Sequence, residues 1–302
     1  TKALSSSVIR ETLTGGYPAV TTLHDYFCAC PNGGFFDYQK ATNCQLVPLS
    51  LACVTTHCDA RSYPQKLWRV GRQFVQRGAG RFPGAMRHFI SVTQFSARIL
   101  KRYLPEAARI HPVANPIDVP YGPGAAVQAH DGVVCVGRLS PEKGGVLLAR
   151  ACQLLGVPVT FVGDGPMRDS IRAACPAARI TGWLPAQQVR AHMTQCRVLV
   201  LPSLWYETQG LVVGEAAALG VPAIVPDACA AREAVLDGTT GLWFRSGDVA
   251  DLKAKISRLQ ADPALAAQMG RAAFERYWRN PATLQRHVGD LERVYHDVLA
   301  SA

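Results

Sequence analysis

From residue 132 onward, short apolar runs alternate with longer amphipathic stretches. The runs include VVCV at 133, VTFV at 159 and VLVL at 198. Continuous apolar runs of this length are typical of strands buried in a parallel sheet, and the stretches between them have the period of covering helices. The alternation predicts a doubly wound α/β sheet, which binds its ligands at the carboxyl ends of the strands.

The stretch at 198–222 has the most informative pattern. Its apolar run stops at Pro202, and a helix is expected from about Thr208, which would cap it, until Gly220. A helix that follows a strand so closely presents unpaired backbone N–H groups at the positive end of its dipole. Such an end suits a diphosphate.

Two carboxylates, Glu207 and Glu215, bracket the start of this helix. Their eight-residue spacing corresponds to at most roughly 12 Å along a helix axis. That separation is too large for a pair sharing one proton but suits hydroxyl groups on either side of a diphosphate. Glu215 stands among apolar residues, where a carboxylate needs a hydrogen-bond partner, and ligand hydroxyls could provide it. The alternative is an ordinary βα unit with two surface glutamates.

Three segments resemble one known family. They are TLHDY at 22–26, GRLSPEKGG at 137–145 and PSLWYETQGLVVGEAAALGVPAIV at 202–225, which in their order along the chain resemble the motifs of the family 4 retaining glycosyltransferases. The resemblance implies an α/β GT-B fold with two Rossmann-like doubly wound domains facing a cleft. Because no glycine-rich turn precedes His24, the N-terminal domain is expected to be incomplete. The expected divisions are a partial acceptor-side domain at 1–119, a nucleotide-sugar-binding domain at 120–282 and a helix crossing back at 283–302.

The chemistry of the basic residues agrees with this resemblance. Arg138 offers a planar fork and Lys143 a mobile charge to a leaving diphosphate, where they could replace a metal ion. A surface salt bridge with Glu142 is the alternative. The expected diphosphate-binding residues are Arg138, Lys143, Thr208, Gln209, Gly210 and Leu211.

The resemblance also implies roles for other residues. Glu207 would hold donor-sugar hydroxyls and His24 would contact the transferred sugar, which makes these two the candidate catalytic residues. A histidine hydrogen-bonded to Asp25 or to the following loop is the alternative for His24. The ribose and base would be held by Glu215, Gly163, Gly182 and Trp183. No cofactor is expected to be required beyond the nucleoside-diphosphate sugar.

A cysteine-rich loop is expected at 27–65. Cys30, Cys44, Cys53 and Cys58 could hold a structural zinc ion, although no C-x2-C pair is present. Buried reduced thiols are the competing interpretation.

The net charge of +10 is concentrated in one segment. Residues 66–102 contain nine Lys and Arg and no Asp or Glu, with aromatic residues between them. The helix expected at 66–78 would place Leu67, Val70, Phe74 and Val75 inside. An anionic membrane surface or a phosphate-bearing acceptor suits the segment, and a solvated basic face is the alternative. No nucleic-acid-binding pattern is present.

The sequence therefore predicts a retaining glycosyltransferase that moves a sugar from a UDP- or GDP-sugar to a lipid-linked or polysaccharide acceptor in cell-surface glycan synthesis. It would be cytoplasmic and peripheral at the inner face of the membrane. An inactive nucleotide-sugar-binding fragment and a GT-B epimerase are the alternatives.

Overall fold

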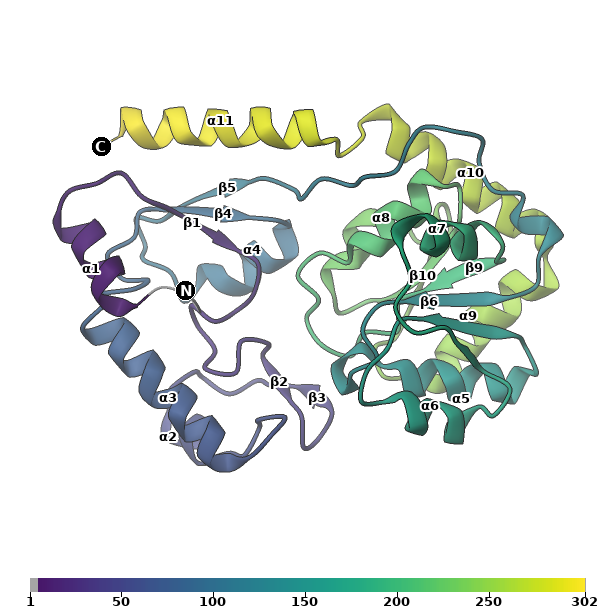
Figure 1. Cartoon of the computed structure of the whole chain (residues 1–302), viewed down its shortest axis with the longest axis horizontal. Coiled ribbons are helices and arrows are strands. Elements are labelled where there is room, and N and C mark those ends of the chain that lie inside the picture. Colours follow the sequence, from purple (N-terminus) through teal and green to yellow (C-terminus); the bar gives the residue numbers. More distant parts are fainter. Residues whose placement is uncertain (1–4, 302) are drawn as a thin grey trace. The chain divides into compact units, whose positions relative to one another are not determined.

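The computed structural model describes residues 5–301, and the chain divides into two compact units (Figure 1). Unit 1 comprises residues 1–116 and 282–302, and unit 2 comprises residues 117–281. Residues 1–4 and 302, which the expected domains include, lie outside the described part of the chain.

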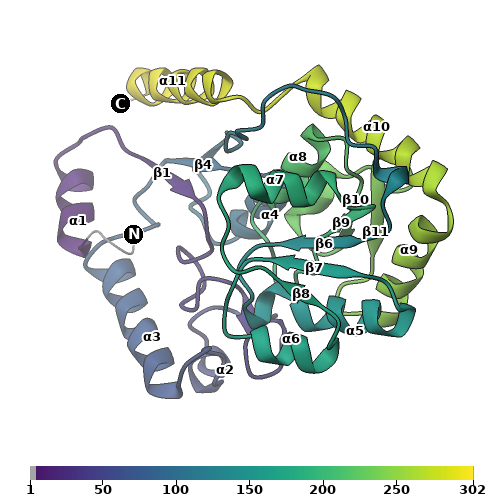
Figure 2. The ribbon, with the colours of Figure 1, turned by 45° about the vertical axis from the view of Figure 1, so that its right-hand side comes forward.

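Unit 2 is a parallel sheet with the strand order β11-β10-β9-β6-β7-β8. The helices α5, α6 and α9 pack on one face, and α7, α8 and α10 lie on the other (Figure 2). The strands are β6 (Val133–Val136), β7 (Val159–Val162), β8 (Arg179–Ile180), β9 (Val198–Val200), β10 (Ala223–Pro226) and β11 (Gly241–Phe244). The α-helices are α5 (Gly145–Leu155), α6 (Arg168–Ala174), α7 (Ala186–Thr194), α8 (Leu211–Ala218), α9 (Val249–Ala261) and α10 (Pro263–Arg279), and the short 3-10 helices are η1 (Val127–Ala129), η2 (Pro141–Lys143) and η3 (Ala230–Ala234).

The core of unit 2 explains why these segments are strands. Leu199, Ile224 and Phe161 are fully buried in one apolar cluster that extends through the sheet. Because both faces of the sheet are covered, the buried strand positions need apolar side chains, and the continuous runs supply them. The predicted doubly wound sheet is confirmed.

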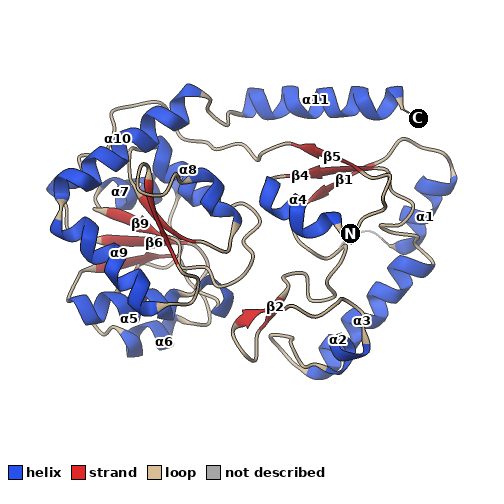
Figure 3. Ribbon diagram, turned by 180° about the vertical axis from the view of Figure 1, so that it is seen from behind, coloured by secondary structure: helices blue, strands red, loops and turns tan. Residues whose placement is uncertain are grey.

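Unit 1 has a smaller parallel sheet with the order β1-β4-β5. Its last helix, α11, packs Val294 and Val298 against Ile90 and Val113. Figure 3 shows these strands in red among the helices of the unit. The elements are α1 (Ser6–Thr14), β1 (Val20–Leu23), the hairpin β2 (Phe36–Asp37) and β3 (Thr42–Asn43), α2 (Leu51–Thr55), α3 (Tyr63–Gly78), β4 (His88–Ser91), α4 (Gln94–Lys101), β5 (Arg109–Pro112) and α11 (Leu284–Ala300).

The helix α3 is oriented opposite to the prediction. Val70 is buried as expected, but Leu67, Phe74 and Val75 are exposed. The buried positions of the helix hold polar groups instead, namely Lys66, Gln73 and Gln76. Gln73 lies inside because its Nε2 donates hydrogen bonds to the carbonyls of Phe27 and Ala29 in the irregular loop. Periodicity identified the helix but not the side that faces inward.

Candidate functional site

The site in unit 2 lies where the order of the sheet reverses. The chain runs from β6 through β7 to β8 in one direction and then returns to place β9 on the other side of β6. The carboxyl ends of two such strands leave a crevice between the connections that follow them, and open α/β sheets bind ligands there. The segment with Arg138 and Lys143 follows β6, and the segment with Glu207 follows β9.

These two segments meet in an ion pair. Lys143 Nζ lies 2.7 Å from Glu207 Oε2, although the residues are 64 positions apart. Glu207 is only 8 % exposed. The same oxygen accepts hydrogen bonds from Ser203 Oγ at 3.0 Å and from Trp205 Nε1 at 3.1 Å. Lys143 also lies over the Trp205 ring, with Nζ 5.2 Å from its centroid. The carboxylate is therefore held rigidly by three donors.

Sequence reasoning missed Ser203 and Trp205 as members of the site. The signal was available, because Ser203, Trp205 and Glu207 alternate along a non-helical segment. In extended chain, every second side chain points to the same side. An alternating serine, tryptophan and glutamate directly after a buried strand indicates a shared polar contact.

Two close backbone approaches fix the loops at this edge of the sheet. A Cβ at Gly144 would lie 2.0 Å from the Pro202 carbonyl oxygen, and one at Gly163 would lie 2.0 Å from the Gly137 carbonyl oxygen. Both glycines also have positive φ, which favours glycine. The connections after β6, β7 and β9 are thereby held against one another.

Arg138 makes a different contact from Lys143. Its Nη2 lies 3.0 Å from Glu142 Oε1, and its Nε donates to Ser140 Oγ at 3.3 Å. The Arg138 side chain is 62 % exposed, whereas Glu142 is buried and also accepts a hydrogen bond from Ser140 Oγ at 2.7 Å. The alternative expected from the sequence, a salt bridge with Glu142, is therefore present for Arg138. Lys143 pairs with Glu207 instead.

The helix α8 begins later than the sequence predicted. Its first residue is Leu211 and its N-cap is Gly210, which has φ of 75°, whereas Thr208 was expected to be the cap. No side chain caps the helix. Thr208, Gln209 and Gly210 form the half-buried turn between the Glu207 site and α8. The predicted placement of these residues at a strand-to-helix turn agrees with the structure, but the predicted cap is wrong.

Glu215 lies half-buried within α8. Burial raises the pKa of its carboxyl group, and Arg190 opposes this increase. Within residues 5–301, its carboxylate has no hydrogen-bond or ion-pair partner in the structure. The carboxylate is thus available to a ligand.

Gly163, Gly182 and Trp183 also lie at the carboxyl ends of strands. Gly163 and Gly182 form a β-bridge that extends beyond β7 and β8. The Trp183 side chain follows this bridge and is 67 % exposed. Its ring offers a free apolar face on which a flat heterocycle can stack.

His24 is the first residue after β1 in unit 1, at the carboxyl end of that strand. Its side chain is exposed and has no hydrogen-bond partner among the described residues. Asp25 does not hold it, because Asp25 Oδ1 accepts from the backbone N–H of Phe27.

Two cysteines lie near the Lys143 and Glu207 pair. Burial raises the pKa values of Cys135 and Cys229 to about 12. Both thiols are therefore protonated near neutral pH and are poor nucleophiles.

The structure does not support the proposed zinc site. Among the described residues, no group of three or more His, Cys, Asp or Glu side chains could hold a metal ion. Cys53 and Cys58 are both directed to Lys66 Nζ, which lies 3.6 and 3.0 Å from their sulfur atoms. The Lys66 ammonium group therefore lies between two thiols that were expected to bind zinc. Cys30 and Cys44 do not complete a ligand set.

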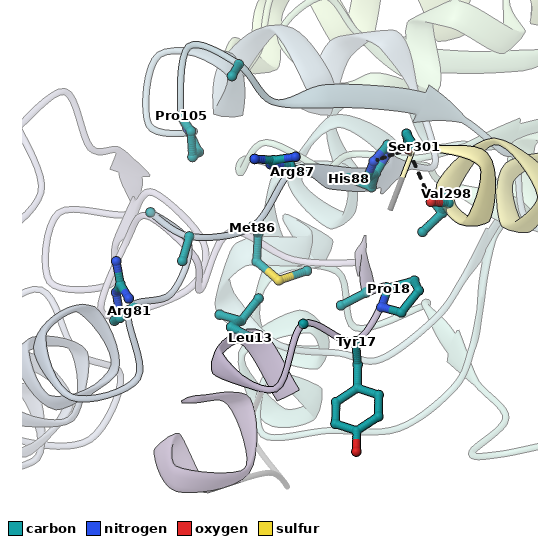
Figure 4. A pocket seen from close by; sticks show the side chains of 15 residues that line it. Leu13, Tyr17, Pro18, Arg81, Met86, Arg87, His88, Pro105, Val298 and Ser301 are labelled. Atoms are coloured by element: carbon teal, nitrogen blue, oxygen red, sulfur yellow. Dashed lines mark hydrogen bonds between the residues drawn. The ribbon is translucent and has the colours of Figure 1, made fainter. Parts of the chain in front are cut away.

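A separate cavity of about 570 Å³ lies in unit 1 (Figure 4). Met86, Arg87 and His88 line it from the amino end of β4, and His88 Nε2 lies 3.0 Å from Ser301 Oγ. Ligands of open parallel sheets bind at the opposite edge. The cavity is therefore distinct from the strand edge that carries His24.

Residues 130–262 match the family described as glycosyl transferases group 1. Among curated proteins, the chain is 32 % identical over 209 residues to the glycogen synthase of Mycobacterium tuberculosis, covering 63 % of this chain and 50 % of that protein. It is 35 % identical over 163 residues to a GDP-mannose-dependent alpha-(1-6)-phosphatidylinositol monomannoside mannosyltransferase of Mycolicibacterium smegmatis, covering 48 % and 42 %. The chain thus spans about half the length of these relatives or less.

Solved structures show the same fold. The sucrose-phosphate synthase of Thermosynechococcus elongatus aligns with a TM-score of 0.69 and 19 % identity, over 95 % of this chain and 69 % of that one. The Anabaena protein HepE, solved with UDP and glucose, aligns with a TM-score of 0.67 and 18 % identity, over 96 % and 76 %. The predicted GT-B fold is confirmed.

Proposed function

Since the chain carries a glycosyl transferases group 1 domain at residues 130–262, we propose that it is a retaining glycosyltransferase with a nucleoside-diphosphate sugar as donor. The observation that carries the proposal is the Lys143 and Glu207 pair at the switch point of the sheet. Relatives that depend on GDP-mannose and a neighbour solved with UDP support a GDP- or UDP-linked donor.

Lys143 and Glu207 keep hydrogen-bonding groups that a substrate can use. An ammonium group has three donors, and Lys143 uses one on Glu207, so that others remain for a diphosphate oxygen. The three side-chain hydrogen bonds to the Glu207 carboxylate all end on Oε2. Within the described chain, Oε1 has no partner and remains an acceptor for a sugar hydroxyl. Charge develops on the leaving diphosphate as the bond to the sugar breaks, and a fixed cation there lowers the barrier.

The other residues fill out the donor site in this proposal. Arg138 turns its exposed guanidinium from Glu142 to the diphosphate, and the 208–211 turn offers backbone N–H groups. Glu215 accepts from the ribose hydroxyls, and Trp183 with Gly163 and Gly182 borders the base. In unit 1, the exposed His24 imidazole can hydrogen-bond a sugar hydroxyl.

The reaction replaces one anomeric bond by another on the same face of the sugar. The bond from the anomeric carbon to the diphosphate oxygen breaks, and a bond to the acceptor oxygen forms. The acceptor hydroxyl proton passes to the leaving diphosphate, which acts as the base. No described residue needs to form a covalent intermediate, and the two protonated cysteines near the pair are poor candidates for one.

The first experiment is a panel of UDP- and GDP-sugars, measured by release of the nucleoside diphosphate and by mass spectrometry of the products. Lys143→Met should abolish turnover, whereas the exposed Glu275→Gln on α10 should not change it. Transfer to a glycan or lipid acceptor supports the proposal. A product isomeric with the donor sugar would indicate the epimerase alternative, and nucleotide binding without turnover would indicate the binding-fragment alternative.

We propose an anionic membrane surface as the location of the acceptor. The outward face of α3 exposes Leu67, Trp68, Phe74 and Val75, and the Trp68 side chain is 61 % exposed. Arg77 and Arg81 are exposed near the end of the same helix. An exposed apolar stripe with flanking arginines inserts its apolar face between lipid headgroups and pairs its charges with anionic lipid. No helix in residues 5–301 is long and apolar enough to cross a bilayer.

Vesicle sedimentation tests this location. Vesicles with about 30 % phosphatidylglycerol should bind the chain in a salt-sensitive manner, and phosphatidylcholine vesicles should not. Trp68→Glu with Phe74→Glu should abolish binding, whereas Tyr121→Glu, at an exposed aromatic residue of unit 2, should not. Equal binding by both variants would contradict the proposal.

A further inference from the structure

The N-terminal half of α3 contains a buried lysine whose ammonium group contacts two thiols. Lys66 is 1 % exposed, and its Nζ lies 3.0 Å from Cys58 Sγ and 3.6 Å from Cys53 Sγ. Both sulfur atoms belong to buried residues. In the described chain no carboxylate forms an ion pair with Lys66, since the nearby Asp59 pairs with Arg69 at 2.9 Å.

A buried ammonium ion without a counter-charge is strongly unfavourable. Burial lowers the pKa of Lys66, and the hydrogen bond and charge of Cys58 raise it, with a net increase. The group beside it that can supply a negative charge is a thiol, and Cys58 is the nearer one. A cation 3.0 Å from the Cys58 sulfur favours attack by that sulfur on a peroxide, since the thiolate is the form of cysteine that peroxides oxidise.

We propose that Cys58 and Lys66 form an oxidative covalent cross-link in response to a peroxide. The Cys58 thiolate attacks one oxygen of hydrogen peroxide, the O–O bond breaks, and a sulfenic acid forms. The hydroxide released takes a proton from Lys66. With the thiolate gone, the buried ammonium has lost its counter-charge, so that release of this proton is favoured.

The second step joins the two side chains. The neutral Lys66 amine attacks the sulfenic sulfur at the short distance already present, the S–O bond breaks, and an S–N bond forms with loss of water, as sulfenic acids do with neighbouring nitrogen. The protein has lost two hydrogen atoms in total, and one peroxide has become two waters. A second peroxide can insert one oxygen atom to give S–O–N and another water.

The consequence is local. The cross-link joins α3 to the segment that follows α2, and α3 carries the exposed apolar stripe on its other side. This inference concerns unit 1 alone and does not depend on the proposed transferase activity.

The test is peptide mapping of the intact chain after treatment with hydrogen peroxide and blocking of free thiols. Trypsin separates residues 41–61, which contain Cys58, from residues 62–66. The cross-link joins the two peptides and prevents cleavage after Lys66, so that 41–61 is found attached to 62–69. The joined mass is about 2 Da below the sum of the two peptides for S–N and about 14 Da above it for S–O–N. Cys152 is equally buried but has no amine partner, and its thiol should remain unoxidised at the same dose.

Two variants separate the steps. Lys66→Arg keeps the positive charge but lacks the nucleophilic amine, and should give a Cys58 sulfenic acid trapped by dimedone without any joined peptide. Lys66→Met removes the charge as well, and should reduce Cys58 oxidation to the level of Cys152.

Several results would overturn the inference. A Cys53–Cys58 disulfide would remain within the 41–61 peptide and leave cleavage after Lys66 intact. Unmodified Cys58 at doses that oxidise Cys152 would exclude an activated thiol. About one zinc ion per purified chain, with thiols protected from peroxide, would show that these cysteines are metal ligands. All three results can be obtained with the wild-type chain, so they do not depend on whether a variant folds.

Discussion

Glu207 and Glu215 stand eight residues apart and have opposite surroundings. Glu207 is buried and receives three donors on one oxygen, from Lys143, Ser203 and Trp205. Glu215 is half-buried in an apolar helix, and burial raises its pKa, which the charge of Arg190 lowers only in part. The first carboxylate is already organised, and the second gains its partners only from a ligand.

A carboxylate in a binding site can be held by donors of the protein or can stay without a partner until a ligand binds. An organised carboxylate contributes to the folded structure, and its loss leaves its donors unsatisfied. An unpartnered one costs folding free energy until a ligand binds. Substitutions at the two positions should therefore move activity and stability in different combinations.

Glu207→Gln should have the largest effect. The amide removes the charge that pairs with Lys143 and disturbs the hydrogen bonds from Ser203 and Trp205. We expect kcat/KM to fall about 1,000-fold, which is about 4 kcal/mol, and the free energy of unfolding to fall by about 2 kcal/mol. Steady-state kinetics and urea denaturation measure these changes. Wild-type stability in this variant would show that the ion pair is not structural.

Glu215→Gln should separate binding from stability. We expect nucleoside-diphosphate affinity to fall about 10- to 100-fold, because ribose hydroxyls lose a charged acceptor. The free energy of unfolding should stay the same or rise near neutral pH. Isothermal titration with UDP and GDP, together with thermal denaturation, measures both quantities. A large loss of stability would mean that Glu215 has a partner of its own within the fold.

The pH dependence of stability should sharpen the contrast. Since the pKa of Glu215 is raised in the folded state, the native protein binds its proton more tightly than the unfolded chain. The unfavourable contribution is absent below the unfolded-state pKa and grows as pH rises through the folded-state pKa. The stabilisation of Glu215→Gln over wild type should therefore be near zero at about pH 4 and largest at about pH 8. Thermal denaturation of both proteins across this range measures it, and a difference independent of pH would contradict this origin.

Arg138→Ala should have the smallest effect on activity. Only the arginine side of its pair with Glu142 is exposed, and the buried Glu142 keeps the hydrogen bond from Ser140 Oγ, so we expect the free energy of unfolding to fall by about 1 kcal/mol. If the guanidinium turns to the diphosphate, the donor KM should still rise about tenfold, or about 1.4 kcal/mol. Kinetics at varied donor concentration measures this, with Arg168→Ala, which pairs with Asp164, as a matched control.

The sequence predicted the sheet of unit 2 because its runs are apolar throughout, and burial on both faces leaves few alternatives for such runs. It placed Arg138, Lys143 and Glu207 at strand ends for the same reason. It could not show that Lys143 rather than Arg138 reaches Glu207, because that contact depends on the close approach of Gly144 to Pro202.

The errors have related causes. Thr208 is a good capping residue, but the turn before α8 is completed by Gly210 in a left-handed conformation. The apolar positions of α3 have helical spacing, yet nothing in the spacing tells that Gln73 would find backbone carbonyls inside. The cysteine spacing could not show that Lys66 would lie between two of the expected zinc ligands. The orientation of α3 and the position of Lys66 depend on tertiary contacts, which the local pattern does not contain.

The tight backbone contacts at Gly144 and Gly163 also limit how new donor specificities can be selected. Insertions or backbone changes in one of these connections would displace its neighbours. Most variants in a library with grafted loops at this edge would therefore fail to fold. A side chain that projects from the fixed backbone into solvent, such as that of Trp183, can vary without that penalty. Directed evolution toward another nucleotide or sugar should therefore proceed by point substitutions at such positions, with the connections kept at their present lengths.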